Sequence, residues 1–178
     1  MADGGFRPSL TTMAPVDSAN ADISQDQKLR ELAQGFGRAA ATQDAQALRK
    51  ITTDDVTLTV PGTSRLAGRH QGVDDVLQVP GALQRAGLKL EVLWVATGAS
   101  SVVICGRDHG ERHGVTLDVT VAMVLTLTGD RISGVVMHLS DVKAFSTYVD
   151  AALPPRDLPP SPKPGREGLF AVPTNRNG

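Results

Sequence analysis

The sequence predicts an α+β fold with an antiparallel sheet. Apolar residues recur at helical spacing early in the chain, the apolar period changes to two residues after Gly87, and short links separate the predicted strands that follow. Helices followed by a run of strands are typical of α+β proteins, and short links between strands favour antiparallel hairpins.

The first part of this pattern contains most of the predicted helix. A stripe at helical spacing predicts a first amphipathic helix, and its members are Leu29, Leu32, Ala33, Phe36 and Ala40. Asp44 is the expected N-cap of a short second helix. A half-buried strand over 56–60 ends at Pro61, and a polar loop leads to a third helix over 73–83. Pro80 is expected to kink or end that helix.

The second part alternates apolar and polar residues and predicts strands over 88–96, 102–106, 115–127 and 132–139. Residues 107–113 are mostly charged and are interpreted as a connection. Gly129 lies between the last two strands in a Thr-Gly-Asp hairpin turn. Asp141 is the expected N-cap of a final helix.

The chain divides into one domain and two tails. Residues 1–24 show no regular period and predict a mobile arm, and residues 25–152 form the predicted domain. Residues 153–178 are rich in proline, which favours an extended chain. This tail is either free or docked on the domain or on a partner subunit.

Composition excludes several classes of function. Eighteen Lys+Arg against 19 Asp+Glu give a net charge of −1, which argues against a nucleic-acid coat or a polybasic membrane anchor. A single cysteine, Cys105, excludes an intramolecular disulfide. The sequence has no apolar run long enough for a membrane span and no secretory signal. We therefore expect a cytoplasmic protein without nucleic-acid or membrane partners.

Three segments together resemble a known family. Residues 36–56 pass from a helix through an acidic turn to Asp-Asp-Val, residues 68–76 contain G-x-x-x-G-x-x-x-V, and Gly-Asp-Arg-Ile at 129–132 is followed by Asp141. Their order and spacing are similar to those of SnoaL-like polyketide cyclases, over about residues 27–152. The resemblance implies the nuclear-transport-factor-2-like (NTF2-like) fold, a cone-shaped barrel. In this fold a curved, mostly antiparallel sheet wraps around a pocket that N-terminal helices close.

Two candidate catalytic residues follow from the strand pattern and the resemblance. The longest predicted strand has one apolar face and one face on which Thr116 and Thr120 flank Asp118. The resemblance implies that Asp118 points into the pocket, and it places a catalytic polar group at His138, three residues before Asp141. A carboxylate and an imidazole in one apolar cavity would form an acid/base pair. The alternative is that both are structural, and the sequence does not give their register.

Other residues are candidate ligand contacts. We expect Trp94 to form a flat apolar wall, His109 or Arg107 to lie at the pocket rim, and further contacts from Thr116, Thr120 and Val136. His109 and His113 lie four residues apart with carboxylates between them, but the neighbouring glycines favour a hairpin over a metal site. We therefore expect no metal, and no cofactor fingerprint is present.

The resulting hypothesis is a cofactor-free cyclase, isomerase or dehydratase that acts on a hydrophobic oxygenated molecule such as a polyketide intermediate. The limonene epoxide hydrolase pattern R-x-D is absent, since Thr116 occupies the arginine position and His138 replaces the second aspartate. The alternatives are a ligand-binding protein or a dimerising accessory domain of the same fold.

The apolar strand face also suggests an oligomer. Its size predicts a homodimer through Val119, Val121, Met123 and Leu125, with Val135, Met137 and Leu139 beside them.

Overall fold

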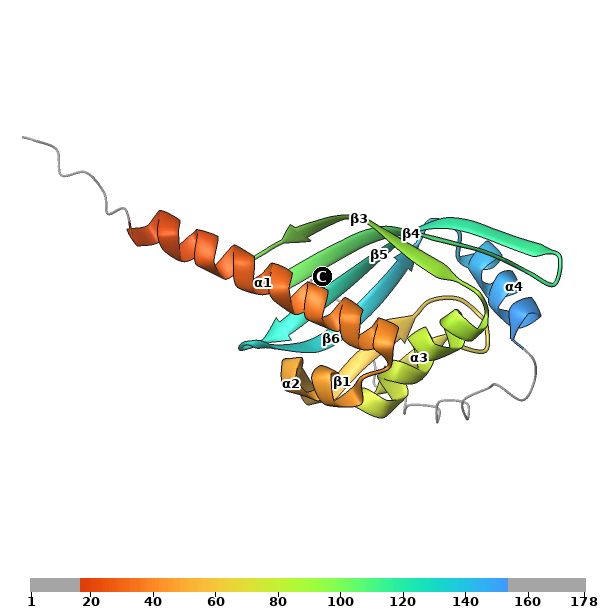
Figure 1. Ribbon diagram of the computed structural model, residues 1–178, viewed down its shortest axis with the longest axis horizontal. Coiled ribbons are helices and arrows are strands. Elements are labelled where there is room, and N and C mark those ends of the chain that lie inside the picture. Colours follow the sequence, from red (N-terminus) through yellow and green to blue (C-terminus); the bar gives the residue numbers. More distant parts are fainter. Residues whose placement is uncertain (1–16, 154–178) are drawn as a thin grey trace, which may run out of the picture.

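The computed structural model describes residues 17–153 of the chain (Figure 1). Two predicted segments lie largely outside the described residues. They are the arm over 1–24, of which only 17–24 are described, and the proline-rich tail over 153–178, of which only Leu153 is described. The elements, in chain order, are α1 (Asp17–Thr42), α2 (Ala45–Ile51), β1 (Thr52–Val60), β2 (Gly68–Gln71), α3 (Val73–Arg85), β3 (Lys89–Thr97), β4 (Ser101–Arg112), β5 (Val115–Thr128), β6 (Arg131–Leu139) and α4 (Val142–Ala152).

The strands form one six-stranded sheet in the order β2-β1-β6-β5-β4-β3. All neighbouring pairs are antiparallel except β1 and β6, which run parallel. The sheet is curved and does not close, so β2 and β3 are its two edges. The predicted α+β class with a mostly antiparallel sheet is confirmed.

Helices cover the concave face of this sheet. Helix α1 crosses in front of the strands, α2 and α3 lie beside β1, and α4 lies at the opposite end (Figure 1). Asp44 and Asp141 cap α2 and α4 as predicted, because their side chains accept hydrogen bonds from the amides of Ala47 and Ala144. In α4, the buried Tyr148 hydroxyl donates to the carbonyl oxygen of Ala86 at 2.8 Å.

Several boundaries differ from those predicted, and among them β1 begins at Thr52 instead of residue 56. Helix α1 begins at Asp17, within the predicted arm, and β2 pairs with β1 where a polar loop was expected. Helix α3, predicted over 73–83, ends at Arg85 with Pro80 inside it, and the apolar residues on both sides of this proline are buried against the core. Strand β4 continues to Arg112 through the predicted charged connection, since β3 and β5 pair with it on both sides.

The apolar face of β5 packs inside the chain. Val119, Val121, Leu125, Val135 and Met137 are 0–5% exposed, and they belong to the core that the helices cover. The homodimer interface predicted through these residues is therefore wrong, because helices α1, α3 and α4 already remove this face from water.

Close packing between β3 and β4 depends on Gly106. A Cβ atom at this position would lie 2.7 Å from the carbonyl oxygen of Glu91 and 2.6 Å from Cδ1 of Leu90, both on β3. Only glycine allows the edge strand to approach β4 this closely without a shift of backbone.

We expect Gly106→Ala to lower the free energy of unfolding by about 1–3 kcal/mol, because the added methyl group must displace β3. Chemical denaturation would measure this loss. Gly35→Ala is the matched control, since its Cβ would meet only the terminal methyl group of Ile51 at 3.4 Å. This control should keep or raise stability, and equal losses in both variants would contradict the packing argument.

Candidate functional site

A cavity of about 350 Å³ lies between the concave face of the sheet and the helices. Its volume is at the lower end of the range typical of small-molecule sites. The lining is almost entirely apolar and comes from helices α1–α3 and from strands β1, β3, β4, β5 and β6. Its apolar members include Phe36, Leu48, Leu58, Val76, Leu77, Val79, Leu83, Leu88, Leu90, Val92, Val121, Met123 and Met137.

Asp108, on β4, is the one titratable residue among the described residues that line this cavity. It lies on the inner face of β4 together with Val102, Ile104 and Gly106, and its neighbours across the strands are Leu90 and Val119. The residue is only 3% exposed. The strand alternation therefore directs a carboxyl group into an apolar cavity.

Burial raises the pKa of the Asp108 carboxyl to about 7, because an apolar environment disfavours the charged form. No described residue contributes a hydrogen bond or charge that shifts this pKa. The carboxyl is therefore present in both its protonated and ionised forms near neutral pH. Such a group can accept a proton from a ligand and return it.

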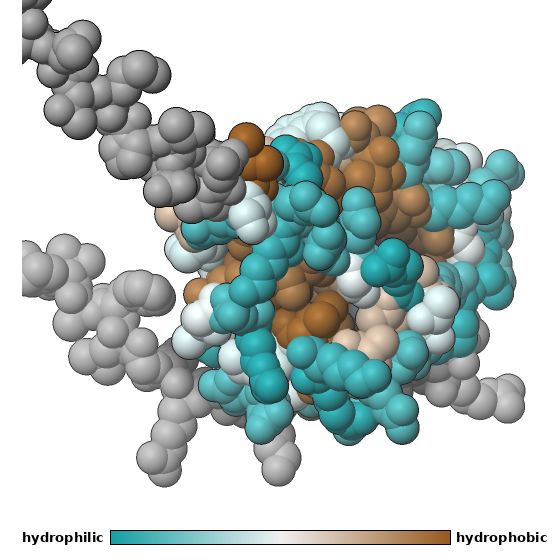
Figure 2. Space-filling view, turned by 60° about the vertical axis from the view of Figure 1, so that its left-hand side comes forward, coloured by the Kyte–Doolittle hydropathy of each residue, from teal (hydrophilic) through white to brown (hydrophobic). Residues whose placement is uncertain are grey.

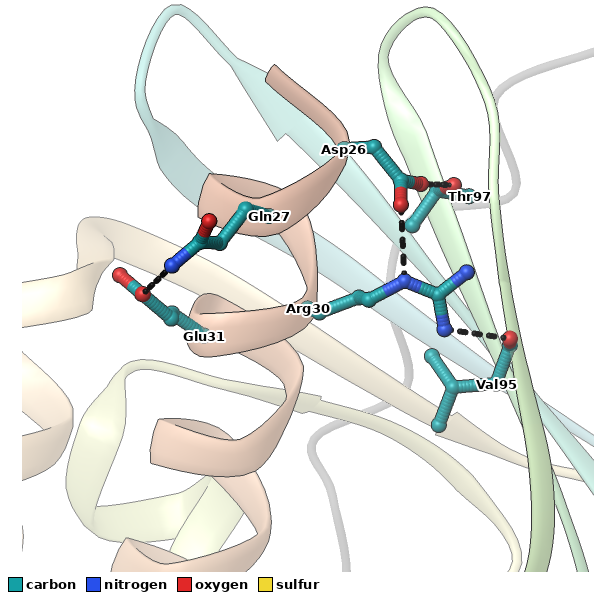
Figure 3. Close-up of polar contacts among 6 residues, drawn as sticks. All are labelled: Asp26, Gln27, Arg30, Glu31, Val95 and Thr97. Carbon is teal, nitrogen blue, oxygen red and sulfur yellow. Dashed lines mark hydrogen bonds and ion pairs between the residues drawn. The ribbon is translucent and has the colours of Figure 1, made fainter. Parts of the chain in front are cut away.

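The helix that covers the cavity is fixed to the edge strand by polar contacts (Figure 3). Arg30 donates to the carbonyl oxygen of Val95 at 3.1 Å and to Asp26 at 2.9 Å, and Asp26 accepts a hydrogen bond from Thr97. The Thr97 hydroxyl and then Arg30 lower the pKa of Asp26. These contacts hold the N-terminal half of α1 against β3. Gln27 and Glu31 bond to each other on another side of the helix.

A second tie joins α1 to α3 at the other end of the cavity. The side-chain amide of Gln84 donates to the carbonyl oxygen of Ala41 at 3.0 Å and to that of Ala40 at 3.5 Å. Gln84 also lines the cavity, so its amide is the other polar side chain in the described lining.

Asp118 does not point into this cavity. It is exposed on the outer face of β5, where Arg107 on β4 forms two hydrogen bonds with it at 2.7 and 2.5 Å. This ion pair lowers the pKa of the Asp118 carboxyl. The expected orientation is wrong because the polar face of β5 meets solvent and the apolar face meets the helices.

His138 lies on the same outer face, but it is not in register with Asp118. His138 pairs with Ala122 on β5, whereas Asp118 pairs with His109 on β4. Both residues of the predicted acid/base pair are exposed. The structure therefore does not bring the two side chains together in the cavity.

The predicted ligand contacts also lie on the outer face. Trp94 is 52% exposed and pairs with Cys105, whose neighbour on β5 is Ala122. The others on this face are Thr116, Thr120, Val136 and His109, and none of them lines the cavity. Within residues 17–153, no group of three or more His, Cys, Asp or Glu side chains could hold a metal ion.

The sequence analysis missed Asp108 because it ended the strand at Gly106. The two-residue period of Val102 and Ile104 continues through Gly106 to Asp108, so a longer strand would have placed this carboxyl on the apolar face.

Solved structures confirm the fold that the family resemblance implied. The chain is similar to an NTF2-like protein from Burkholderia xenovorans, with 16% identity, a TM-score of 0.60 and coverage of 70% of this chain and 97% of that one. A protein from Jannaschia named for its likeness to SnoaL-like polyketide cyclases matches with 17% identity, a TM-score of 0.57 and coverage of 71% and 94%.

A third similar structure is that of TerC co-crystallised with polyporic acid. It has 15% identity, a TM-score of 0.58, and coverage of 69% of this chain and 98% of the other. No family model and no curated protein matches the sequence. These likenesses establish an NTF2-like fold. In the described part of the chain, none of the helices has the length and apolar character to cross a membrane.

The pKa of Asp108 predicts how stability depends on pH. The folded chain holds this proton up to about pH 7, whereas an unperturbed aspartate loses it near 3.8. Between these two pH values the folded chain binds more protons than the unfolded chain, so the free energy of unfolding falls as pH rises. The contribution of Asp108 is highest below about pH 4 and declines by up to about 4 kcal/mol by about pH 7.

Urea denaturation at several pH values would measure this decline, and Asp108→Asn should remove it because the amide does not titrate. Asp55→Asn, at an exposed position on β1, is the control and should keep the wild-type profile. An unchanged pH profile in Asp108→Asn would show that Asp108 is not the group responsible.

Proposed function

We propose that the protein is a cofactor-free enzyme that moves a proton within a neutral, hydrophobic small molecule, with Asp108 as the proton-transfer group. The observation that carries this proposal is a carboxyl with a pKa of about 7 that faces an apolar cavity of ligand size. Groups that titrate near the working pH are the most effective general acids and bases.

The absence of a second titratable group in the described cavity lining favours one kind of reaction. Ionised Asp108 would remove a proton from carbon next to a carbonyl group, and the carboxylic acid formed would return that proton at another position. These two proton transfers together make an isomerisation. The enolate formed after the first transfer can instead act as the nucleophile of a ring closure. We therefore favour an isomerase or cyclase over a dehydratase, which uses separate acid and base groups.

The substrate class follows from the lining. A charged ligand would lose its hydration in this cavity and would find no oppositely charged group in the described lining, because its walls are apolar and its one ionisable group is an acid. A neutral oxygenated hydrocarbon skeleton, such as a polyketide intermediate, fits these walls. The similar protein from Jannaschia, whose name refers to SnoaL-like polyketide cyclases, and TerC, which was co-crystallised with polyporic acid, support this class.

A binding protein of the same fold is the second candidate. No described residue forms a hydrogen bond that orients the Asp108 carboxyl, and catalytic carboxyls are usually held by such contacts. In this case the cavity would hold a ligand without changing it.

We also propose a homodimer, formed through the outer face of the sheet. Trp94 and Val136 are exposed on this face, and Cys105 and Ala122 lie beside Trp94 in one row across β3, β4 and β5. Large apolar side chains that stay exposed on one sheet face, as Trp94 and Val136 do, are candidate contacts of a protein interface.

The catalytic proposal predicts activity in a reaction that needs only a base. In 5-nitrobenzisoxazole, removal of the ring C–H proton forms a nitrile, breaks the N–O bond and releases a coloured phenolate. The rate should rise with pH around a midpoint near 7, the pKa of Asp108. Asp108→Asn should lower this rate by about 10²-fold or more, because the amide cannot accept the proton.

Two further variants separate the hypotheses. Asp55→Asn is the control and should retain the wild-type rate. The earlier hypothesis, in which Asp118 and His138 act as the acid/base pair, predicts that Asp118→Asn loses the rate and Asp108→Asn keeps it. Binding of the probe without any rate above solution would favour the binding protein.

The homodimer predicts that Trp94→Glu shifts the protein to monomer in sedimentation-velocity experiments, because a charge would be buried in the interface. Ile23→Glu is the matched control, since Ile23 is 66% exposed but lies on α1, away from the outer sheet face. A wild-type protein that is monomeric at micromolar concentration would overturn this proposal.

A further inference from the structure

Some of the residues that line the cavity are themselves exposed, which locates its opening. Leu90 is 43% exposed and Val92 is 55% exposed, and Gly37, Ala41 and Gln84 are also exposed. These residues come from β3, α1 and α3. The cavity therefore opens to solvent where these three elements meet.

The space-filling view supports an apolar hollow at the surface of the protein. Figure 2 shows hydrophobic residues in a hollow near the middle of one face and in a second patch above it, with hydrophilic residues around both.

The two polar ties described above lie on either side of this opening. Arg30 and Asp26 hold the N-terminal half of α1 to β3, and Gln84 holds its C-terminal end to α3. Along the cavity, the α1 lining changes from a large apolar side chain to small ones: Phe36 is followed by Gly37, Ala40 and Ala41. The helix is thus fixed at both ends, and its small residues leave a gap over the cavity.

Gly37 has no structural reason to be glycine. It lies in the middle of a regular helix, and a Cβ atom there would meet no atom within 4 Å. Glycine is one of the least favourable residues in a helix interior, so any larger residue with good helix propensity would stabilise α1. What the missing side chain does provide is free space at the rim of the cavity.

We infer that ligands reach Asp108 through the opening between α1, α3 and β3, and that the missing side chain of Gly37 sets the size of molecule that can pass. This inference rests on the proposed function in so far as both concern the same cavity. It adds a specificity-determining position that does not touch the reacting atoms.

The test uses the full chain and two neutral fluorescent probes of different size, N-phenyl-1-naphthylamine and the smaller 1-naphthol. Gly37→Leu should slow the association of the larger probe by about tenfold or more in stopped-flow measurements, because the added side chain narrows a fixed opening. Association of the smaller probe should change much less.

Gln34→Leu is the matched control, because it adds the same side chain at an exposed position on α1 that does not line the cavity. It should bind both probes at the wild-type rates. Gly37→Ala should raise the melting temperature and leave binding of both probes unchanged, which would show that the fold does not need glycine here.

The outcomes separate this inference from the proposed function. If Gly37→Leu binds the larger probe as fast as the wild type, the inferred opening is wrong while the cavity remains a binding site. If the wild-type protein binds neither probe, the proposed function is wrong as well, because the cavity then takes no neutral hydrophobic ligand.

Discussion

The cover that helices α1, α3 and α4 form over the concave face of the sheet is the constraint on which the other properties depend. It removes the apolar faces of β4, β5 and β6 from water and so supplies the core. It also removes water from Asp108, which shares that face. The same burial that stabilises the apolar neighbours destabilises an ionised carboxylate, and this is the cause of its raised pKa.

Most of the secondary structure could be predicted from the sequence because local signals determine it. The stripe on α1, the capping residues Asp44 and Asp141, and the alternation in β5 all act over a few residues. The elements that were missed depend on distant partners. Strand β2 exists because β1 pairs with it, and β4 extends through charged residues because two neighbouring strands hold it.

The candidate site could not be predicted in the same way. A period of two residues shows which side chains share a face, but it does not show which face the helices cover. The family resemblance suggested that the polar face of β5, with Asp118, lines the pocket. Burial decides otherwise: a wholly apolar face gains most from the helical cover, whereas the charged side chains of Asp118 and Arg107 keep their hydration on the exposed face.

A buried carboxyl group that no residue of the described range 17–153 pairs with lowers stability, and so does an unfilled cavity beside it. Gly37 in the middle of α1 is a third unfavourable feature. All three lie around one space. Local conflicts with stability that gather at one place in a fold are typical of functional sites.

The chemistry of a bound ligand determines which protonation state of Asp108 it favours. A ligand that only fills the cavity removes the last water from the carboxyl and raises its pKa further, which favours the acid. A ligand that donates a hydrogen bond to Asp108 stabilises the carboxylate and lowers the pKa. An enol has such a donor and the corresponding ketone does not, so the enol favours the ionised form, and a bound ketone lowers the ionised fraction that proton removal needs. Since the wild-type pKa lies near 7, both states are accessible within one catalytic cycle at neutral pH.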